Sequence, residues 1–174
     1  MSALTASLPK PEPPIVLLDT NVWIDRFIAT RPRNTVVSAL ISWCLAHDVS
    51  LAYASQSALD VYYQVMAEHK TWWRRERPLT EDVAKAIKRL SWDCVNLMQS
   101  YATAIPQDSS DIYLACKLRD YHDDLEDDLI ISACRRAKAS FLVTSDRKLL
   151  AHANVCAKEP ADMLELLRNE PTLQ

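Results

Sequence analysis

The fold is decided by the stretch Ile15-Val16-Leu17-Leu18-Asp19-Thr20-Asn21, four apolar residues followed by three polar ones. A short run with no polar position predicts a strand buried on both faces, as in a parallel sheet. A second run, Phe141-Leu142-Val143, also ends in a polar triplet, Thr144-Ser145-Asp146. Strands of this kind, separated by helical patterns, predict an α/β fold on a central parallel sheet.

Helical and extended patterns alternate through the rest of the chain. Apolar residues recur at three and four over residues 36–46, which is typical of an amphipathic helix. We expect further helices from a Ser55 cap to about residue 70, from Pro78 to about 98, from a Ser109 or Ser110 cap to 118, over 125–137, and after Pro160. Strands are expected at 49–53 and 102–105, and residues 72–77 are expected to interrupt the helices.

Composition limits the possible functions. The chain has 174 residues, a size typical of one domain, which we place at 14–174 after a Pro-rich tail over 1–13. It has no glycine, which excludes a P-loop, a dinucleotide fingerprint and a nucleophile elbow. Its charge of −3 restricts nucleic-acid binding to local patches. We expect a cytoplasmic protein, because no segment resembles a signal peptide or a membrane span and the five cysteines form no C-x-x-C pair.

Aspartates follow two of the expected strands, Asp19 after the first and Asp146 after the last. Ligand sites in open parallel sheets form beyond the carboxyl ends of the strands. Neighbouring strands lie about 4.8 Å apart, so these two carboxylates can share a hard divalent cation. The alternative is that each aspartate caps the following turn or helix; the matched pair favours the ligand interpretation.

The helix over 125–137 offers a third carboxylate. At about 100° per residue, Asp127 falls on the apolar stripe of this helix, where an unpaired charge is costly. Asp128 is expected to point toward solvent with Ser132 and Arg135, and Asp124 to lie at the edge of the site. Asp60 lies opposite the apolar face of its own helix, where a solvated aspartate is the default.

Four segments in this order resemble a PIN-domain nuclease, and in particular the bacterial VapC-like toxins. They are Leu17-Leu18-Asp19-Thr20-Asn21-Val22, Ser57-Ala58-Leu59-Asp60-Val61-Tyr62, Asp124-Leu125-Glu126-Asp127 and Leu142-Val143-Thr144-Ser145-Asp146. The resemblance covers about residues 15–155. It implies an α/β/α sandwich and Mg²⁺- or Mn²⁺-dependent hydrolysis of RNA. It also implies an antitoxin partner, and we expect a homodimer with no membrane association.

The resemblance also assigns residues. It implies four catalytic acids, Asp19, Asp60, Asp127 and Asp146, with the metal held by Asp19, Asp127 and Asp146 and supported by Asn21, Thr144 and Asp124. Three departures from the family pattern are visible. Asp60 replaces the usual Glu and is one methylene shorter; Asp128 stands where Ala is common; Lys138-Ala139 stands where a glycine commonly ends the helix, so strain of up to about 1 kcal/mol is expected there.

A basic and aromatic segment is the candidate RNA contact, through Lys70, Trp72, Arg74, Arg75 and Arg77. Bases stack on indoles while arginines bind phosphates. The segment equally suits a dimer or antitoxin interface, because aromatic residues and Arg also mark protein interfaces. Two other functions stay open, a catalytically inactive RNA-binding or regulatory module of the same fold and a metal-dependent phosphatase with Asp19 as nucleophile.

Overall fold

The structure is a computed structural model that describes residues 14–119 and 124–169. The predicted tail over 1–13 lies outside the described residues, and the assignment of 14–174 to a single domain stays a prediction. The sheet has five parallel strands, in the order β3-β2-β1-β4-β5. Their bounds are β1 Ile15–Leu18, β2 Ser50–Ala54, β3 Thr103–Ile105, β4 Phe141–Val143 and β5 Ala157–Lys158.

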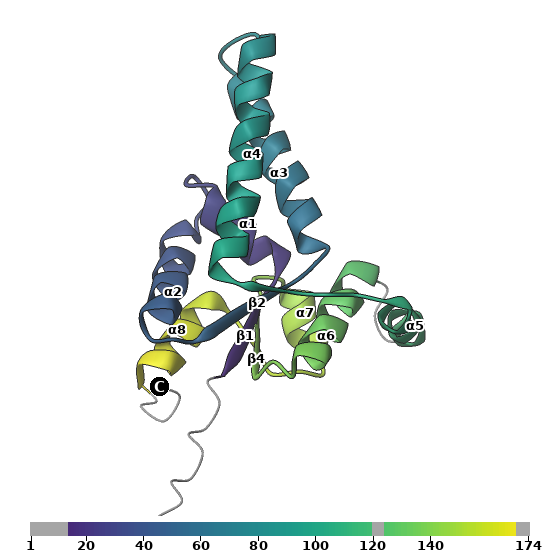
Figure 1. The fold of residues 1–174 in the computed structure, drawn as a ribbon. Helices are drawn as coiled ribbons and strands as arrows, with labels where there is room; N and C mark the ends of the chain where they lie inside the picture. Colours follow the sequence, from purple (N-terminus) through teal and green to yellow (C-terminus); the bar gives the residue numbers. More distant parts are fainter. Residues whose placement is uncertain (1–13, 120–123, 170–174) are drawn as a thin grey trace, which may run out of the picture.

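Helices cover both faces of this sheet (Figure 1). They are α1 Thr20–Phe27, α2 Asn34–Ala46, α3 Ser57–Arg74, α4 Glu81–Tyr101, α5 Ser109–Leu118, α6 Leu125–Ala137, α7 Arg147–His152 and α8 Pro160–Asn169. Side chains alternate across a strand, so Val16 and Leu18 pack with α1, α2, α3, α4 and α8, whereas Leu17 packs with α6 and α7. The predicted three-layer α/β/α sandwich is therefore confirmed.

The two strands that end in polar triplets are neighbours in register. Leu17 pairs with Leu142 and Leu18 with Val143, so both strands end at the same level. The backbone N–H of Asp19 donates to the Val143 carbonyl at 2.9 Å, which extends the pairing one residue further. The residues that follow β1 and β4 are consequently held side by side at the carboxyl edge of the sheet.

Helices α3 and α4 form a long antiparallel pair that projects away from the sheet (Figure 1). The prediction that residues 72–77 interrupt the helices was wrong at its start, because α3 continues through Trp72 and Trp73 to Arg74. The last turn is joined to the segment that follows it, because Trp73 Nε1 donates to the Pro78 carbonyl at 3.2 Å. Within the described ranges, no helix is long and apolar enough to cross a membrane.

Two predicted helix caps were wrong. Helix α3 begins after Gln56, which makes no side-chain cap, rather than after Ser55. Helix α5 is capped by Asp108, whose side chain accepts from the Ser110 N–H at 2.7 Å, and not by Ser109 or Ser110. The carboxylate of Asp111 accepts in return from the Asp108 N–H at 2.8 Å, which completes a capping box.

The turn after α6 has the expected departure from helical geometry. Lys138 has φ 52° and ψ 40°, a left-handed conformation that glycine adopts without cost. This confirms the sequence prediction that a non-glycine residue ends this helix in a conformation that favours glycine.

Candidate active site

Asp19 lies at the centre of a hydrogen-bond network at the ends of β1 and β4. Its side chain is only 4% exposed. Oδ1 accepts from the Thr20 N–H at 2.6 Å, and Oδ2 accepts from Asn21 Nδ2 and from the Thr144 hydroxyl, both at 2.6 Å. Asp19 also caps α1, as the alternative interpretation of the sequence allowed. The carboxylate is therefore fixed in orientation from three directions.

Burial makes this carboxylate costly to ionise. Burial raises the pKa of Asp19 to about 7, against the hydrogen bonds of Thr144 and Thr20, which lower it. The carboxylates of Asp127 and Glu126 raise that pKa further, so both lie near Asp19. A buried carboxylate with anionic neighbours favours either a proton or a bound cation.

Asn21 and Thr144 connect Asp19 to the start of α7. Asn21 Nδ2 donates to Thr144 Oγ1 at 3.2 Å, and Asn21 Oδ1 accepts from the Ser145 N–H at 3.1 Å. Thr144 Oγ1 also accepts from the Asp146 N–H at 3.0 Å. Asn21 and Thr144, two of the three expected supporting residues, thus connect the two strand-end aspartates.

Asp146 is exposed and caps α7, its Oδ1 accepting from the N–H groups of Lys148 and Leu149 at 2.6 and 3.1 Å. One carboxylate oxygen is occupied by this cap, and a carboxylate has capacity for about four hydrogen-bond or metal contacts. Capping and ligation are therefore compatible at this residue.

The first turn of α6 brings further acids to the same place. Asp124 caps the helix through the N–H groups of Glu126 and Asp127, at 3.0 and 3.4 Å. Asp127 is half-buried. Its pKa is raised to about 6 by burial first and then by the charges of Asp124, Asp146, Glu126 and Asp128. Asp127 is thus the point where the acids of α6 and α7 interact.

Helix α3 contributes Asp60. The Thr20 hydroxyl donates to the Ser57 hydroxyl at 2.9 Å, which fixes the first turn of α3 beside Asp19. Asp60 lies in that turn and is half-buried, and burial raises its pKa. The default expectation of a freely solvated aspartate was therefore wrong.

Glu126 is an acid of this cluster that the sequence interpretation missed. Desolvation, followed by the charge of Asp60, raises the pKa of Glu126, whereas a hydrogen bond with Thr20 lowers it. It therefore links Asp60 of α3 to the acids of α6. The sequence offered one signal, its place in the quoted Asp124–Asp127 motif, but a first-turn acid reads equally well as a partner of the helix dipole.

The prediction that Asp128 and Ser132 face solvent was wrong. Asp128 is 2% exposed and Ser132 3%, because α5 packs over this side of α6. The Ser132 hydroxyl donates to Asp111 Oδ1 at 2.7 Å, and Arg136 pairs with Asp111 Oδ2 at 2.6 Å. Burial acts to raise the pKa of Asp111, but these contacts and the Asp108 N–H outweigh it and lower that pKa. These polar groups form a helix–helix contact beside the acid cluster.

The donors suit a hard divalent cation. Every ionisable side chain named in the cluster is a carboxylate, and the buried Ser145 hydroxyl between Thr144 and Asp146 has no hydrogen-bond partner in the described part of the chain. Oxygen ligands are those that Mg²⁺ and Mn²⁺ prefer. No three His, Cys, Asp or Glu side chains among the described residues are already gathered tightly enough to hold an ion. The acids therefore have the right chemistry but not a closed coordination shell.

The basic and aromatic segment is divided by the structure. Trp72 and Arg75 line one hollow with Thr30 of the α1–α2 connection. Arg77 instead lies over the Trp73 ring, 5.6 Å from its centre. Lys70 is half-buried and Arg74 is exposed on α3. Trp72 and Arg77 also line a second hollow with Trp73 and Glu76. Trp72 therefore adjoins both hollows, and the role of these five residues in RNA contact stays a prediction.

A model of the PIN domain family matches residues 15–148. The chain therefore belongs to the PIN domain family. Among solved structures, its fold is similar to that of VapC20 from Mycobacterium tuberculosis, a sarcin-ricin loop cleaving toxin. That match has a TM-score of 0.50 and 13% identity, and it covers 78% of this chain and 93% of the other. A search of curated proteins gave no match.

Proposed function

We propose that this chain is a metal-dependent endoribonuclease that uses Mg²⁺ or Mn²⁺. The observation that carries the proposal is the convergence of Asp19, Asp127 and Asp146 from β1, α6 and β4, with the pKa values of Asp19 and Asp127 raised to about 7 and about 6. Burial is the main cause of both shifts, and the charges of neighbouring carboxylates add to it. A divalent cation at the carboxyl edge of a parallel sheet would favour the ionised form of these carboxylates. Membership of the PIN family supports the same assignment.

In this proposal Asp19, Asp127 and Asp146 hold the cation. When bound, a divalent cation supplies Lewis acidity to a phosphodiester and to the water that attacks it. Asn21 and Thr144 keep the Asp19 carboxylate in one orientation through their 2.6 Å hydrogen bonds. Asp124 fixes the first turn of α6, which presents Asp127.

In this proposal Asp60 and Glu126 do not hold the cation and act as general bases. Their charges interact, and both have raised pKa values. Such acids exchange protons nearer to neutral pH than free carboxylates do. Here they accept a proton from the attacking water, directly or through a second water. The shorter Asp60 is thereby complemented by Glu126.

The toxin role is the finer part of the proposal. The similar fold of VapC20 and the PIN family match support it. With the toxin role we also propose an antitoxin protein as partner and a homodimer. At 13% identity, the sarcin-ricin loop target of VapC20 is not transferred to this chain. Expression of the wild-type chain is expected to arrest growth, and Asp146→Asn is expected to relieve the arrest.

The cleavage test uses a total-RNA pool with Mg²⁺, Mn²⁺ or EDTA, mapped by end sequencing. Wild type and the exposed control Asp162→Asn should cut in either metal and not in EDTA, whereas Asp19→Asn should lose at least about a hundredfold in rate. If wild type cuts no RNA and Asp127→Asn behaves identically, the chain is an inactive binding module. The phosphatase alternative lacks support, because the side chain two residues after Asp19 is an amide that donates to Asp19.

A further inference from the structure

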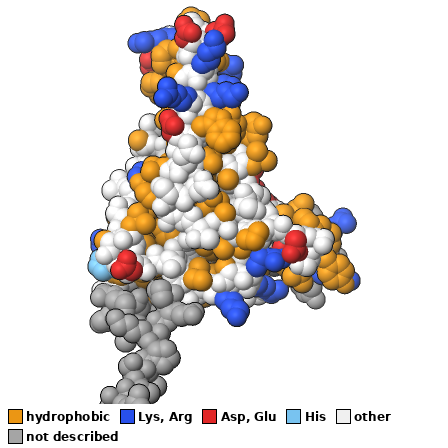
Figure 2. Space-filling model, viewed as in Figure 1, with side chains coloured by type: hydrophobic (Ala, Val, Ile, Leu, Met, Phe, Trp, Pro, Cys, Tyr) orange, Lys and Arg blue, Asp and Glu red, His pale blue; other side chains and the backbone are white. Residues whose placement is uncertain are grey.

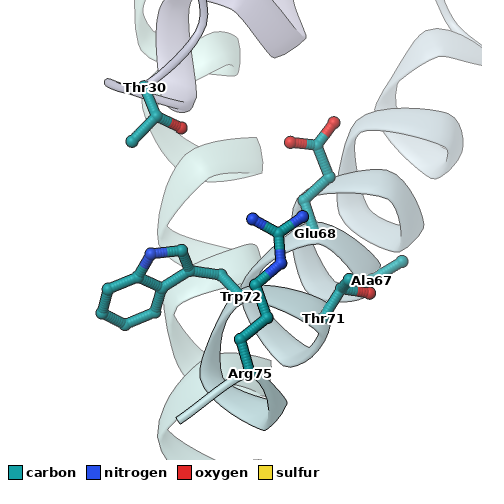
Figure 3. A pocket seen from close by; sticks show the side chains of 6 residues that line it. All are labelled: Thr30, Ala67, Glu68, Thr71, Trp72 and Arg75. Carbon is teal, nitrogen blue, oxygen red and sulfur yellow. The ribbon is translucent and has the colours of Figure 1, made fainter.

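A hollow of about 290 Å³ lies beside the outer half of α3, well away from the acid cluster. Its lining includes Thr30, Glu68, Thr71, Trp72 and Arg75. Figure 3 shows the Arg75 side chain reaching back along α3 toward Glu68, with the Trp72 indole on one side and Thr30 across from it. An aromatic face, a cation and a carboxylate therefore meet in one open hollow near the size of small ligand sites.

Trp72 is the open indole of the Trp72–Trp73 pair. It is 55% exposed. Trp73 is half-buried, its Nε1 donates to the Pro78 carbonyl at 3.2 Å, and Arg77 covers its ring. Trp73 thus belongs to the α3–α4 turn, and Trp72 keeps a ring face available for a ligand.

The charged groups of the hollow have unused capacity. Arg75 makes no side-chain hydrogen bond or ion pair with any described residue. One oxygen of Glu68 pairs with Arg31, which also bonds Asp25 at 3.2 Å, so the carboxylate is held in place from the α1–α2 side. The second Glu68 oxygen has no partner in the described ranges. The Arg75 guanidinium can therefore donate hydrogen bonds to a ligand in the hollow, and the second Glu68 oxygen can accept one.

An exposed stripe of α3 joins this hollow to the acids. At about 100° per residue, Gln64, Ala67 and Thr71 follow Asp60 along one side of the helix and lead to Arg75. All three are exposed, and the opposite side packs on α4 through the contact of Tyr62 with Trp92. The rise from Asp60 to Arg75 is about 22 Å, which a few nucleotides of extended strand can span.

We propose that the Trp72 hollow is a nucleobase subsite that holds an unstacked guanine of a single-stranded RNA substrate. The base stacks on Trp72, the Arg75 fork donates to guanine O6 and N7, and Glu68 accepts from guanine N1 and N2. The strand then runs along the Gln64–Thr71 stripe to the acid cluster. This subsite rests on the proposed nuclease function for its place in catalysis, but its binding is independent of the cation.

The surface around the hollow favours a nucleic acid as occupant over a protein partner. Figure 2 shows Lys, Arg, Asp and Glu side chains at the tip of the α3–α4 pair with hydrophobic side chains among them, and further hydrophobic side chains lower on that pair and on α5. A protein interface is built around a central apolar cluster depleted of charge. The hollow instead combines one aromatic face with a cation and a carboxylate, as a base-reading site does.

The test measures binding of labelled ten-nucleotide RNAs by fluorescence anisotropy in EDTA, so that no cleavage intervenes. Oligo-uridine with one central guanosine should bind wild type about tenfold or more tightly than oligo-uridine alone. Trp72→Ala and Arg75→Gln should abolish that difference. Trp92→Ala is the matched control, because Trp92 is 54% exposed and lies on α4, and it should retain the preference.

A second arm changes the base and compares wild type with a Glu68 variant. Replacing the guanosine by inosine removes the N2 amine and should weaken binding to wild type about fivefold or more, with no such effect in Glu68→Gln. Thermal melts of each variant show whether it is folded. Equal binding of the two oligonucleotides by wild type overturns the proposal. A guanosine preference that survives in Trp72→Ala also overturns it. So does a Trp72→Ala variant that differs from wild type in its oligomeric state but not in RNA binding. Guanosine-specific binding by a protein that cuts no RNA would retain the subsite and refute the nuclease.

Discussion

The Thr144 hydroxyl donates to Asp19 Oδ2 at 2.6 Å and thereby ties the end of β4 to the end of β1. Thr144 Oγ1 also accepts from Asn21 Nδ2 and from the Asp146 N–H. The Thr144 side chain therefore orients Asp19, Asn21 and the start of α7. Both Thr144 and Asp19 are nearly inaccessible to solvent, at 0% and 4%. This bond is a buried side-chain link between the two strand ends that carry the site.

Thr144→Val is expected to lower the free energy of unfolding by about 1–3 kcal/mol, because it leaves buried polar groups unpaired. It should also raise the pKa of Asp19 further, since the Thr144 bond lowers it. Urea denaturation measures the first effect, and the pH dependence of Mn²⁺ binding by calorimetry measures the second. Thr144→Ser keeps the hydroxyl and should restore both; a Val variant that binds Mn²⁺ with the wild-type pH profile would contradict this role.

The metal-free protein is expected to lose stability as pH rises from about 4 to about 7. The Asp19 carboxyl has a pKa of about 7 in the folded chain against an ordinary 3.8, so the folded state holds its proton more tightly, and the stabilisation present at low pH is lost across that interval. The shift sets an upper limit of about 4 kcal/mol. The lowered pKa of Asp111 acts in the opposite sense but only below its ordinary value of 3.8.

Urea denaturation in EDTA at several pH values measures this slope. Asp19→Asn should reduce the slope, most of all near pH 7, and the part that remains below about pH 6 comes from the raised pKa of Asp127. The exposed control Asp162→Asn should leave the slope unchanged. Added Mg²⁺ at pH 8 should restore stability, because it binds the ionised carboxylates of the folded state. A wild-type curve that is flat between pH 4 and 7 would show that Asp19 ionises without cost.

The core of the fold was predictable because its signals are local and strong. The apolar pattern of Ile15–Leu18 fits a buried strand, and that of Leu125–Ala137 fits a helix with one apolar side. Both elements have the predicted bounds. The side-by-side placement of Asp19 and Asp146 followed from the geometry of a parallel sheet. The catalytic and metal-binding roles of these residues stay predictions.

The errors came from tertiary contacts that no local pattern encodes. Asp128 is buried on a helix that α5 packs against, and the α3 that continues through Trp72 packs against α4. The short helices α1 and α7 were not predicted, since the signals that begin them are the site aspartates themselves. The interaction of Glu126 with Asp60 joins two helices far apart in sequence and was likewise invisible.

Asp60 and Glu126 are expected to act on the same proton transfer. Asp60→Asn and Glu126→Gln should each lower the RNA cleavage rate about tenfold or more, and the double variant should lose much less than the product of the two. Asp60→Glu restores the longer acid usual in the family and should make the rate less sensitive to Glu126→Gln. Rates on one RNA substrate in Mn²⁺ provide the measurement, with Glu165→Gln on α8 as an exposed control. Multiplicative losses would mean that the two acids act in separate steps.

Lys138→Gly is expected to stabilise the chain by up to about 1 kcal/mol. Lys138 ends α6 at φ 52° and ψ 40°, where a Cβ crowds the backbone and glycine does not. Its N–H still donates to the Arg135 carbonyl at 3.1 Å, so glycine keeps the hydrogen bond that closes the helix. Urea denaturation at fixed pH measures the change. Lys138→Ala removes the same charge but keeps a Cβ and should give no gain; an equal gain from Ala and Gly would assign the effect to the lysine charge rather than to the left-handed backbone.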